Sequence, residues 1–398
     1  MKRWMRTMAV CLLAVLWCAG AHAMTMEETV KGGKVAMRAW TEEGATVNGP
    51  EGYAYVTYTY SDTTVTESYF TADSQPFVTA GGYHIRTLTY GNRHRLTEVV
   101  YYDRDGNRAV NAAGYSRVKI AYTSKGQVTT VNYYGADNKA VVVPSLGYAS
   151  QDNDYRGTTL TQTAYLDAAK RPVNIPAGYA TMVQRVNKSN QIVEIRFEGV
   201  DGSPAACEAG WADCRRELDS KGRLLSASYT DAAGAPVSTA GGYARETFSW
   251  EGDRSFVIHR YDAAGASAPM GEGYAAVRRE TDRDGRVIRE SYLDETGQAA
   301  LNRLQAGATA YTYDDQGRIS RVALEDGYGS EIAGLEGWAE FTDTFDDFGR
   351  VLTRSFAGPD GSAVNTAEGY SEIRYTYDGA GSVIAAEYLD TEGNPVIR

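Results

Sequence analysis

Apolar and polar residues alternate in short runs along the chain from Gly33 to the C-terminus. In residues 370–377 the apolar side chains share one parity and the polar side chains share the other. This two-residue period is typical of a β-strand with one solvated face. Residues 383–389 form a second such run, and an Asp-Gly-Ala-Gly segment at 378–381 has the composition of a turn. Residues 369–395 therefore predict one β-hairpin followed by an exit turn.

The same unit recurs along the chain, and each unit begins with a glycine and an aromatic residue. Successive units start 30 to 34 residues apart, and a degraded unit starts at Gly307-Ala308. Residues 33–51 match the second half of a further unit. The other ten units begin at Gly52-Tyr53, Gly82-Tyr83, Gly114-Tyr115, Gly147-Tyr148, Gly178-Tyr179, Gly210-Trp211, Gly242-Tyr243, Gly273-Tyr274, Gly337-Trp338 and Gly369-Tyr370.

A fixed period of this length indicates a repeat architecture in which each unit buries its apolar face against its neighbours. We therefore expect an all-β fold of tandem β-hairpin repeats, with a period of about 32 residues. Because long sheets twist, the hairpins should form a superhelical antiparallel sheet or a solenoid. One interruption, Gln298–Ala306, is rich in helix formers and predicts one or two helical turns.

The first 23 residues have the pattern of a secretory signal. Lys2, Arg3 and Arg6 precede an apolar run that is too short to span a bilayer, and a small-x-small motif ends at Ala23. We expect cleavage between Ala23 and Met24, and an extracytoplasmic location in the periplasm, at the cell surface or after release. The domains are then a signal peptide at 1–23, a short polar segment at 24–32 and the repeat array at 33–398.

The charge balance disfavours two classes of partner. The chain has a net charge of −11, and residues 24–398 carry 37 basic and 51 acidic side chains, a net charge of −14. A negative field of this size disfavours nucleic acids and anionic membrane surfaces. No further stretch is apolar enough to span a membrane.

Cys207 and Cys214 are the cysteines that remain after residue 23, and they flank one repeat junction. In an oxidising compartment, two cysteines this close in sequence favour a structural disulfide. A redox motif would have two intervening residues, whereas this pair has six. A zinc site would need further ligands, and beyond residue 23 the chain offers only the histidines His84, His94 and His259.

Other motifs with chemical potential favour structural roles. The Asp-x-Asp-Gly runs at Asp103–Gly106 and Asp282–Gly285 lack the third acid and the distal glutamate of a calcium loop. The pairs Asp314-Asp315 and Asp346-Asp347 occupy the same turn position in successive units. No convergent acid, base or nucleophile emerges, so we expect no catalytic residue, metal ligand or cofactor site.

Tyrosine is unusually abundant, with 29 residues against 9 phenylalanines. Rings in fixed positions along an array are able to hold sugar rings, or they form a thin core. Tyr58, Tyr60, Tyr375 and Tyr377 share the parity of Val56 and Ile373, which favours the core. The sequence identifies no particular aromatic residue as a binding residue.

The segment Tyr311–Ile319, with the sequence YTYDDQGRI, resembles the YD repeats of bacterial RHS-type surface proteins, as do Tyr375–Asp378 and Gly381. The whole unit is also similar to secreted bacterial repeat proteins with comparable turns followed by Gly-Tyr-Ala. The period near 32 is longer than that of YD repeats, and neither an RHS cleavage region nor a toxin domain is evident. The resemblance implies an extracytoplasmic β-rich scaffold and assigns no catalytic residue.

Together these patterns predict a non-catalytic scaffold for binding or adhesion whose partner is a glycan, a cell-envelope polymer or a surface protein. Two alternatives stay open. The first is a purely structural spacer or shell element without a ligand of its own, and the second is a carbohydrate-active enzyme. Saturable binding to one ligand class would separate the scaffold from the spacer.

Overall fold

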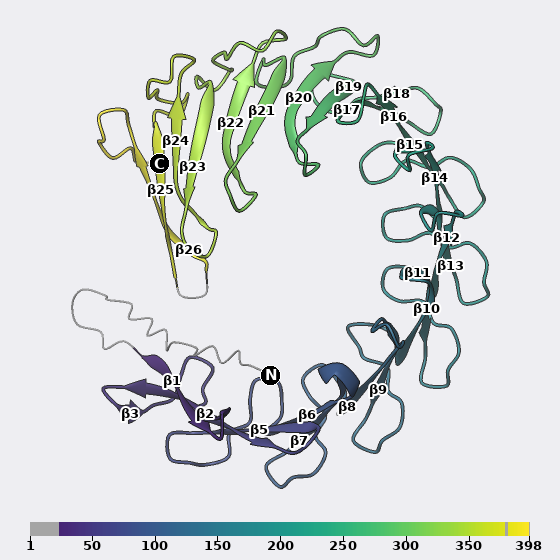
Figure 1. Ribbon diagram of the computed structural model, residues 1–398, viewed down its shortest axis with the longest axis vertical. Coiled ribbons are helices and arrows are strands. Elements are labelled where there is room, and N and C mark those ends of the chain that lie inside the picture. The colour runs from purple at the N-terminus through teal and green to yellow at the C-terminus, as the bar shows by residue number, and fades with distance from the viewer. Residues whose placement is uncertain (1–23, 379–380, 398) are drawn as a thin grey trace, which may run out of the picture. The chain divides into compact units, whose positions relative to one another are not determined.

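The computed structural model describes residues 24–378 and 381–397, and in this part of the chain the fold is all-β (Figure 1). It contains 26 strands in antiparallel pairings and one short 3₁₀ turn, Asn92–His94. The expected fold class of tandem β-hairpins is confirmed. The predicted signal, residues 1–23, lies outside the described residues. The described residues divide into two compact units, one that runs to Val183 and includes Glu198–Ser203, and one of Gln184–Phe197 with the described residues from Pro204 onward.

In the first unit each strand pairs with the strand before it, except that Tyr55–Tyr60 pairs with Lys34–Glu42 and not with the two-residue strand Ala45–Thr46 between them. Hairpins therefore follow one another along the chain. Residues 24–32 were expected to be a loose polar segment, but they contain an exposed strand that pairs with the next one and completes the first hairpin. The strands are β1 (Thr25–Lys31), β2 (Lys34–Glu42), β3 (Ala45–Thr46), β4 (Tyr55–Tyr60), β5 (Thr64–Phe70), β6 (Ile85–Tyr90), β7 (Leu96–Tyr102), β8 (Arg117–Tyr122), β9 (Val128–Tyr134), β10 (Ser150–Arg156) and β11 (Thr159–Leu166).

The point of division falls within β12 (Thr181–Val186) and at the end of β13 (Ile192–Glu198). The second unit continues the same arrangement of hairpins. Its strands are β14 (Asp213–Leu218), β15 (Leu224–Thr230), β16 (Arg245–Trp250), β17 (Ser255–Tyr261), β18 (Ser267–Ala268), β19 (Ala276–Thr281), β20 (Val287–Leu293), β21 (Ala308–Tyr313), β22 (Ile319–Glu325), β23 (Glu340–Phe345), β24 (Val351–Ala357), β25 (Glu372–Tyr377) and β26 (Val383–Leu389).

One turn design closes most hairpins and exits. At Asp314, one carboxylate oxygen accepts the backbone N–H groups of Gln316 and Arg318, both at 2.9 Å. The Gly317 N–H closes the turn on the Asp314 carbonyl, and Gly317 adopts a φ of 81°, which glycine tolerates best. The predicted Asp-x-Asp-Gly segments and paired aspartates occupy turns of this kind. Their role is therefore structural, as expected.

A β-bulge precedes the last residue of the first strand in many hairpins. In β21 the register shifts between Thr312 and Tyr313, so that Tyr313 pairs with Ile319. The same shift occurs before Tyr90, Tyr122, Phe345 and Tyr377. Since a bulge locally re-aims a side chain, it directs each of these aromatic rings at the end of the strand.

The degraded repeat has a different register from the one predicted. Gln305, with a φ of 63°, occupies the position at which other repeats have the glycine of the Gly-aromatic pair. Ala306 occupies the position of the aromatic residue. Gly307 is equivalent to the alanine that follows the aromatic residue elsewhere, since its N–H donates to the Glu325 carbonyl as Ala339 donates to Ala357. The helix predicted at Gln298–Ala306 is wrong. This segment forms a β-bridge at Ala299 and then a turn, like its counterparts.

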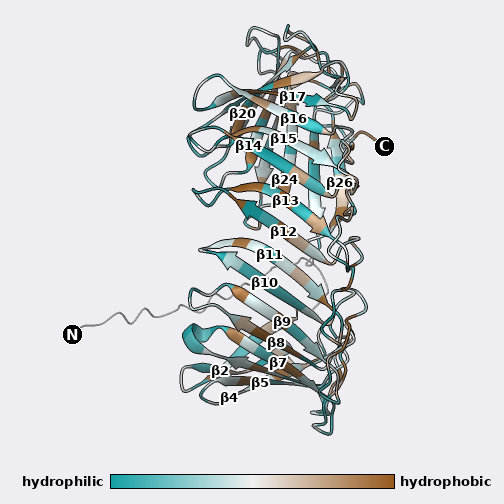
Figure 2. Cartoon of the chain, turned by 90° about the vertical axis from the view of Figure 1, so that its right-hand side faces the viewer, coloured by the Kyte–Doolittle hydropathy of each residue, from teal (hydrophilic) through white to brown (hydrophobic). Residues whose placement is uncertain are grey.

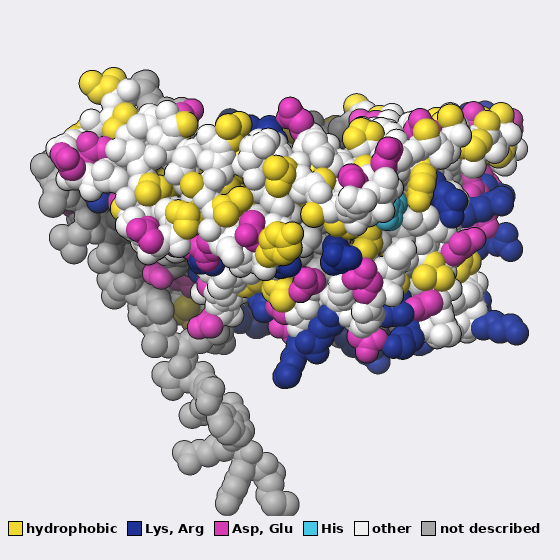
Figure 3. Space-filling model, turned by 90° about the horizontal axis from the view of Figure 1, so that it is seen from above, with side chains coloured by type: hydrophobic (Ala, Val, Ile, Leu, Met, Phe, Trp, Pro, Cys, Tyr) yellow, Lys and Arg dark blue, Asp and Glu magenta, His cyan; other side chains and the backbone are white. Residues whose placement is uncertain are grey.

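Cross-strand register assigns the side chains of the first unit to two faces. One row crosses five strands on one side of the sheet, which we call the tyrosine face: Val65–Leu88–Val99–Val118–Tyr133. The row Thr64–Thr89–Glu98–Lys119–Asn132 crosses the same strands on the opposite side, which we call the threonine face. The strands in Figure 2 accordingly show alternating hydrophobic and hydrophilic segments, and Figure 3 shows acidic and basic side chains interspersed on the side in view.

Candidate functional site

The residues of the YD-like motif link neighbouring repeats. The Arg318 guanidinium donates to the Asp314 carboxylate at 2.6 Å and lies 4.2 Å from the ring centre of Phe345 in the next repeat. Arg286 stacks on Tyr313 in the same way, at 4.8 Å. The Tyr313 hydroxyl donates to the Val287 carbonyl at 2.7 Å. The motif is therefore an inter-repeat clamp.

Hydrogen bonding explains the electrostatics of these turns. The Arg318 N–H and guanidinium, together with the Gln316 N–H, hold the pKa of the Asp314 carboxyl below its ordinary value. The equivalent backbone N–H donors in other turns lower the pKa of the Asp219, Asp346 and Asp390 carboxyls. Hydrogen bonds to the charged form of a carboxyl favour ionisation. These shifts accompany turn formation and do not indicate an active site.

The aromatic residues of the first unit form a continuous ladder. The ring after each glycine packs against the ring near the end of each second strand, with ring centres 4.8–6.1 Å apart. Tyr148 is 9% exposed, and burial raises its pKa to about 12. The rings are Tyr53, Tyr69, Tyr83, Tyr101, Tyr115, Tyr133, Tyr148, Tyr165 and Tyr179. Edge-to-face and tilted packing of this kind stabilises a thin core.

In the second unit the ladder has two interruptions. It runs from Phe197 to Tyr243, and then Arg260 replaces a ring and stacks on Tyr243 at 4.2 Å. It stops again where Ala306 and Leu324 replace rings, both almost fully buried. It resumes with Trp338, Phe356, Tyr370 and Tyr388.

The interpretation of the tyrosines as core holds for this ladder and partly for the four tyrosines singled out in the sequence. Tyr58 and Tyr375 are half-buried, whereas Tyr60 is 39% exposed. The hydroxyls of Tyr60 and Tyr377 donate to the carbonyls of Val35 and Val351. The rings of Tyr60 and Tyr377 therefore cover the ends of neighbouring strands.

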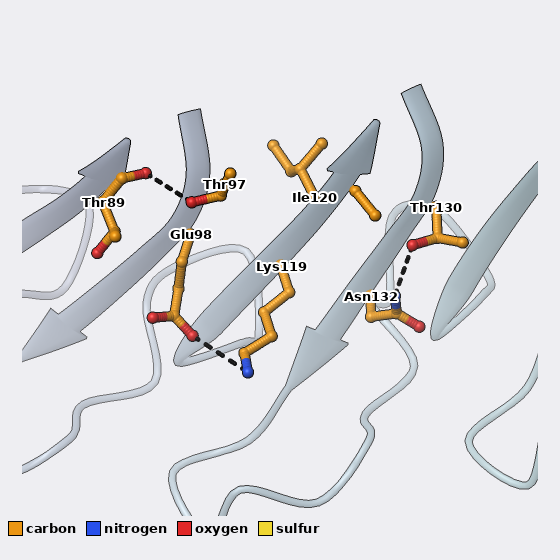
Figure 4. Close-up of a pocket in the computed structure, with 8 residues that line it drawn as sticks. Thr89, Thr97, Glu98, Lys119, Ile120, Thr130 and Asn132 are labelled. Carbon is orange, nitrogen blue, oxygen red and sulfur yellow. Dashed lines mark hydrogen bonds and ion pairs between the residues drawn. The ribbon is translucent and has the colours of Figure 1, made fainter. Parts of the chain in front are cut away.

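The best candidate for a binding site is a polar groove on the threonine face of the first unit, with a volume of about 360 Å³ (Figure 4). Its floor is a register row that crosses four strands, Thr89–Glu98–Lys119–Asn132. Thr97, Ile120, Ala121 and Thr130 complete the lining. Sequence reasoning missed this groove because the row brings together residues from four separate strands.

The groove carries a balanced set of polar groups. The Lys119 ammonium lies 3.7 Å from the Glu98 carboxylate and its side chain is 50% exposed. Arg117 also approaches Glu98, at 3.6 Å. The Asn132 amide donates to the Thr130 hydroxyl at 3.2 Å and accepts from Lys170 at 2.7 Å. The arrangement offers hydroxyl, amide and ammonium groups to a ligand but no nucleophile activated by a base.

A second cavity, of about 320 Å³, lies among the aromatic residues of the second unit. Its walls include Trp338, Phe356 and Tyr370, each less than 10% exposed. Trp338 and Tyr370 donate to the adjacent carboxylates of Glu336 and Glu368. Because the ring faces are already packed, this cavity lacks the open platform that stacks a sugar ring.

The predicted disulfide is absent from this structure, where Cys207 and Cys214 are both free thiols. Cys207 begins a junction turn, and Cys214 is buried on β14 next to Ile195 in register. Burial raises the pKa of the Cys214 thiol to about 11. Oxidation of the pair stays a prediction. Of the predicted cleavage pair, Met24 is exposed, and Ala23 lies outside the described residues.

The three histidines beyond residue 23 do not converge. The His84 ring is buried and contacts the Phe77 carbonyl at 3.2 Å, His94 is in an exposed turn, and His259 is half-buried on β17. Within residues 24–378 and 381–397, no three His, Cys, Asp or Glu side chains gather as they would around a metal ion. In the same part of the chain, no helix has the length and apolar character needed to cross a membrane.

No family model matches the chain, and no curated protein sequence matches it. Among solved structures, it is similar to TcdB2-TccC3-TEV (10% identity, TM-score 0.29, 94% of this chain and 22% of that one). It is also similar to the Photorhabdus luminescens Tc holotoxin pore (11%, 0.29, 92% and 21%) and to a porin-like protein from Bacteroides uniformis (8%, 0.20, 83% and 92%). The chain spans about a fifth of the two toxin chains. TM-scores this low establish neither a shared fold nor a shared activity.

Proposed function

We propose that this chain is a non-catalytic, extracytoplasmic repeat scaffold that binds an extended polymer along its threonine face. The observation that supports the proposal is the register row Thr89–Glu98–Lys119–Asn132 and the groove above it. Neighbouring strands lie roughly 4.8 Å apart, so four strands present polar groups over about 15 Å. This length suits several units of a chain-like ligand better than a single small molecule.

The chemistry of the groove favours a ligand rich in hydroxyl groups, such as a glycan of the cell envelope. Threonine hydroxyls and the asparagine amide both donate and accept hydrogen bonds, and the lysine adds three donors. The groove has few apolar residues and no exposed ring, so recognition would rest on hydrogen bonds. A surface protein with a polar loop is the second class of partner.

The alternative of a spacer without a ligand differs in one measurable respect. A spacer would bind no polymer saturably, whereas the scaffold should bind one class and lose that binding when the groove changes. The extracytoplasmic location rests on the pattern of residues 1–23 and is tested separately, by fractionating cells and sequencing the N-terminus of the exported protein.

The test is a screen of the purified chain, residues 24–398, on an array of glycans and cell-wall polymers. Hits are titrated by calorimetry with wild type and with Lys119→Ala and Asn132→Ala. We expect each substitution to weaken binding by roughly tenfold, since one hydrogen bond to a charged or amide group is worth about 1.4 kcal/mol. Lys139→Ala is the matched control, because Lys139 is 85% exposed on a neighbouring turn outside the groove. The proposal would be contradicted if no polymer on the array binds, or if the groove substitutions leave the binding affinity unchanged.

A further inference from the structure

The turn Gly91–Arg95 between β6 and β7 departs from the turn design that closes most hairpins. Glycine replaces the capping aspartate, and the consecutive residues Arg93 and His94 adopt φ values of 61° and 54°. The left-handed region disfavours residues other than glycine, and residues held there often mark functional sites. This turn places two arginines, Arg93 and Arg95, at the end of the threonine-face groove.

Arg95 lacks the carboxylate partner that the equivalent arginines have. Arg223, Arg286, Arg318 and Arg350 each form an ion pair with an aspartate four residues earlier, at 2.6–2.7 Å. The residue four positions before Arg95 is Gly91. Among the described residues, no carboxylate forms an ion pair with Arg93 or Arg95, so both positive charges are left without a counter-charge.

The two guanidinium groups line a cleft of about 430 Å³. Arg93 donates to the Ser124 carbonyl at 3.2 Å, and Arg95 donates to the Thr123 carbonyl at 3.3 Å. Arg95 also lies 5.8 Å from the ring centre of Tyr122. A guanidinium has five N–H donors in a fixed plane. These contacts orient the groups and use only part of their donor capacity.

The remaining lining contains no acidic residue. Asn92, Thr97, Thr123 and Ser124 add amide and hydroxyl groups, and Ile120 and Ala121 form the apolar part. Thr97, Ile120 and Ala121 also line the polar groove, so the cleft continues it. In a chain with a net charge of −11, this is a local positive site at the end of a neutral channel.

We propose that this cleft binds an oxyanion, a phosphate or carboxylate group, carried by the polymer that occupies the groove. The proposal rests on the proposed function and deepens it, because it makes the ligand an acidic polymer. Paired guanidinium donors match the geometry of phosphate and carboxylate oxygens. The missing aspartate leaves the Arg95 donors available, since in four other repeats the equivalent aspartate forms an ion pair with the arginine four residues later.

The test titrates the purified full chain by calorimetry with three probes: inorganic phosphate, oligogalacturonate as a carboxylate polymer, and neutral dextran. We expect saturable binding of at least one anionic probe, weakened by added salt. Phosphate binding and oligogalacturonate binding distinguish the two oxyanion sources. If neither anion binds saturably, the proposal is overturned.

Two variants test the residues. Arg93→Gln combined with Arg95→Gln, and separately Gly91→Asp, should each weaken anion binding by at least about tenfold. A Cβ at Gly91 would lie 2.9 Å from the Thr97 methyl, so circular dichroism checks that the variants fold. Arg283→Gln is the matched control, an exposed turn arginine beside Asp282 and Asp284. Unchanged affinity in the folded arginine variants would refute the oxyanion site.

The two proposals fail in different ways. If a neutral polymer binds, and its affinity falls with Lys119→Ala but not with the Arg93 and Arg95 substitutions, the groove proposal is supported and the oxyanion site is refuted. If the anions bind through the arginines while no polymer responds to Lys119→Ala, the oxyanion site stands and the groove proposal falls.

Discussion

The guanidinium of Arg350 lies 4.5 Å from the ring centre of Tyr377, which belongs to the next repeat. The same guanidinium forms an ion pair with Asp346 at 2.6 Å, and the Tyr377 hydroxyl donates to the Val351 carbonyl at 2.8 Å. The tyrosine, aspartate and arginine of the motif thus act on both sides of a repeat junction. This explains why one short motif recurs in a repeat protein whose units depend on their neighbours.

Arg350→Ala should lower the free energy of unfolding of the C-terminal hairpin by about 1–2 kcal/mol, because it removes a cation–π contact and a charge-assisted hydrogen bond. Hydrogen exchange of β25 and β26 is the appropriate measurement, since terminal repeats open independently. Arg283→Ala, at an exposed turn tip, serves as the control and should leave exchange unchanged. Equal protection in the two variants would contradict the clamp.

Tyr377→Phe should cost about 1 kcal/mol, because the substitution deletes a hydrogen bond to the Val351 carbonyl and keeps the ring. Urea unfolding of the variant measures the loss. Tyr328→Phe is the matched control, since Tyr328 is 97% exposed and should tolerate the loss of its hydroxyl. A loss of the same size in both variants would show that the hydrogen bond contributes nothing specific.

Gln305→Gly should stabilise the protein by about 0.5–1 kcal/mol, because Gln305 has a φ of 63° in a position where other repeats have glycine. The reverse change in the following repeat, Gly337→Gln, should be destabilising, since Gly337 has a φ of 87°. Thermal unfolding of both variants tests the revised register of the degraded repeat. Destabilisation by Gln305→Gly would argue against it.

Stability should fall in acid through the turn aspartates. Backbone and guanidinium donors hold the pKa of the Asp314 carboxyl below its ordinary 3.8. A lowered pKa in the folded state means that the carboxyl stabilises the fold above the ordinary value, and that this contribution is lost as pH falls through the folded value. Thermal unfolding between pH 7 and pH 2 measures the effect.

Asp314→Asn provides the comparison for this titration, because Asn187 caps the equivalent hairpin turn between β12 and β13 with the same two backbone hydrogen bonds. The variant should keep the turn and show a shallower decline in stability at low pH. An identical decline in wild type and variant would show that other groups govern acid unfolding.

The two cysteines should differ in reactivity while reduced. Burial raises the pKa of Cys214 to about 11, whereas Cys207 lies in a half-buried junction turn. A thiol reagent should therefore label Cys207 first and Cys214 only on unfolding. Peptide mapping without reductant, on protein exported through an oxidising compartment, tests the predicted disulfide. Two free thiols in that material would show that the disulfide prediction is wrong.

The local pattern of the sequence was sufficient for the repeat, the strand alternation and the turns. Alternating parity predicted strands such as residues 372–377, and Asp-x-x-Gly predicted turns, because both depend on residues a few positions apart. The local reading was wrong for Gln298–Ala306, whose helix formers lie in a bridge and a turn. It also missed the strand at residues 25–31, which is polar and exposed and is stabilised by its pairing with β2.

The clamps, the groove and the arginine cleft depended on the tertiary structure. Tyr377 and Val351 are 26 positions apart, and the row Thr89–Glu98–Lys119–Asn132 joins four strands. Bulges shift the register by one residue and thereby decide which side chains share a face. Composition and period do not encode these offsets, because cross-strand register is set by hydrogen bonding between whole strands and by the packing of neighbouring repeats.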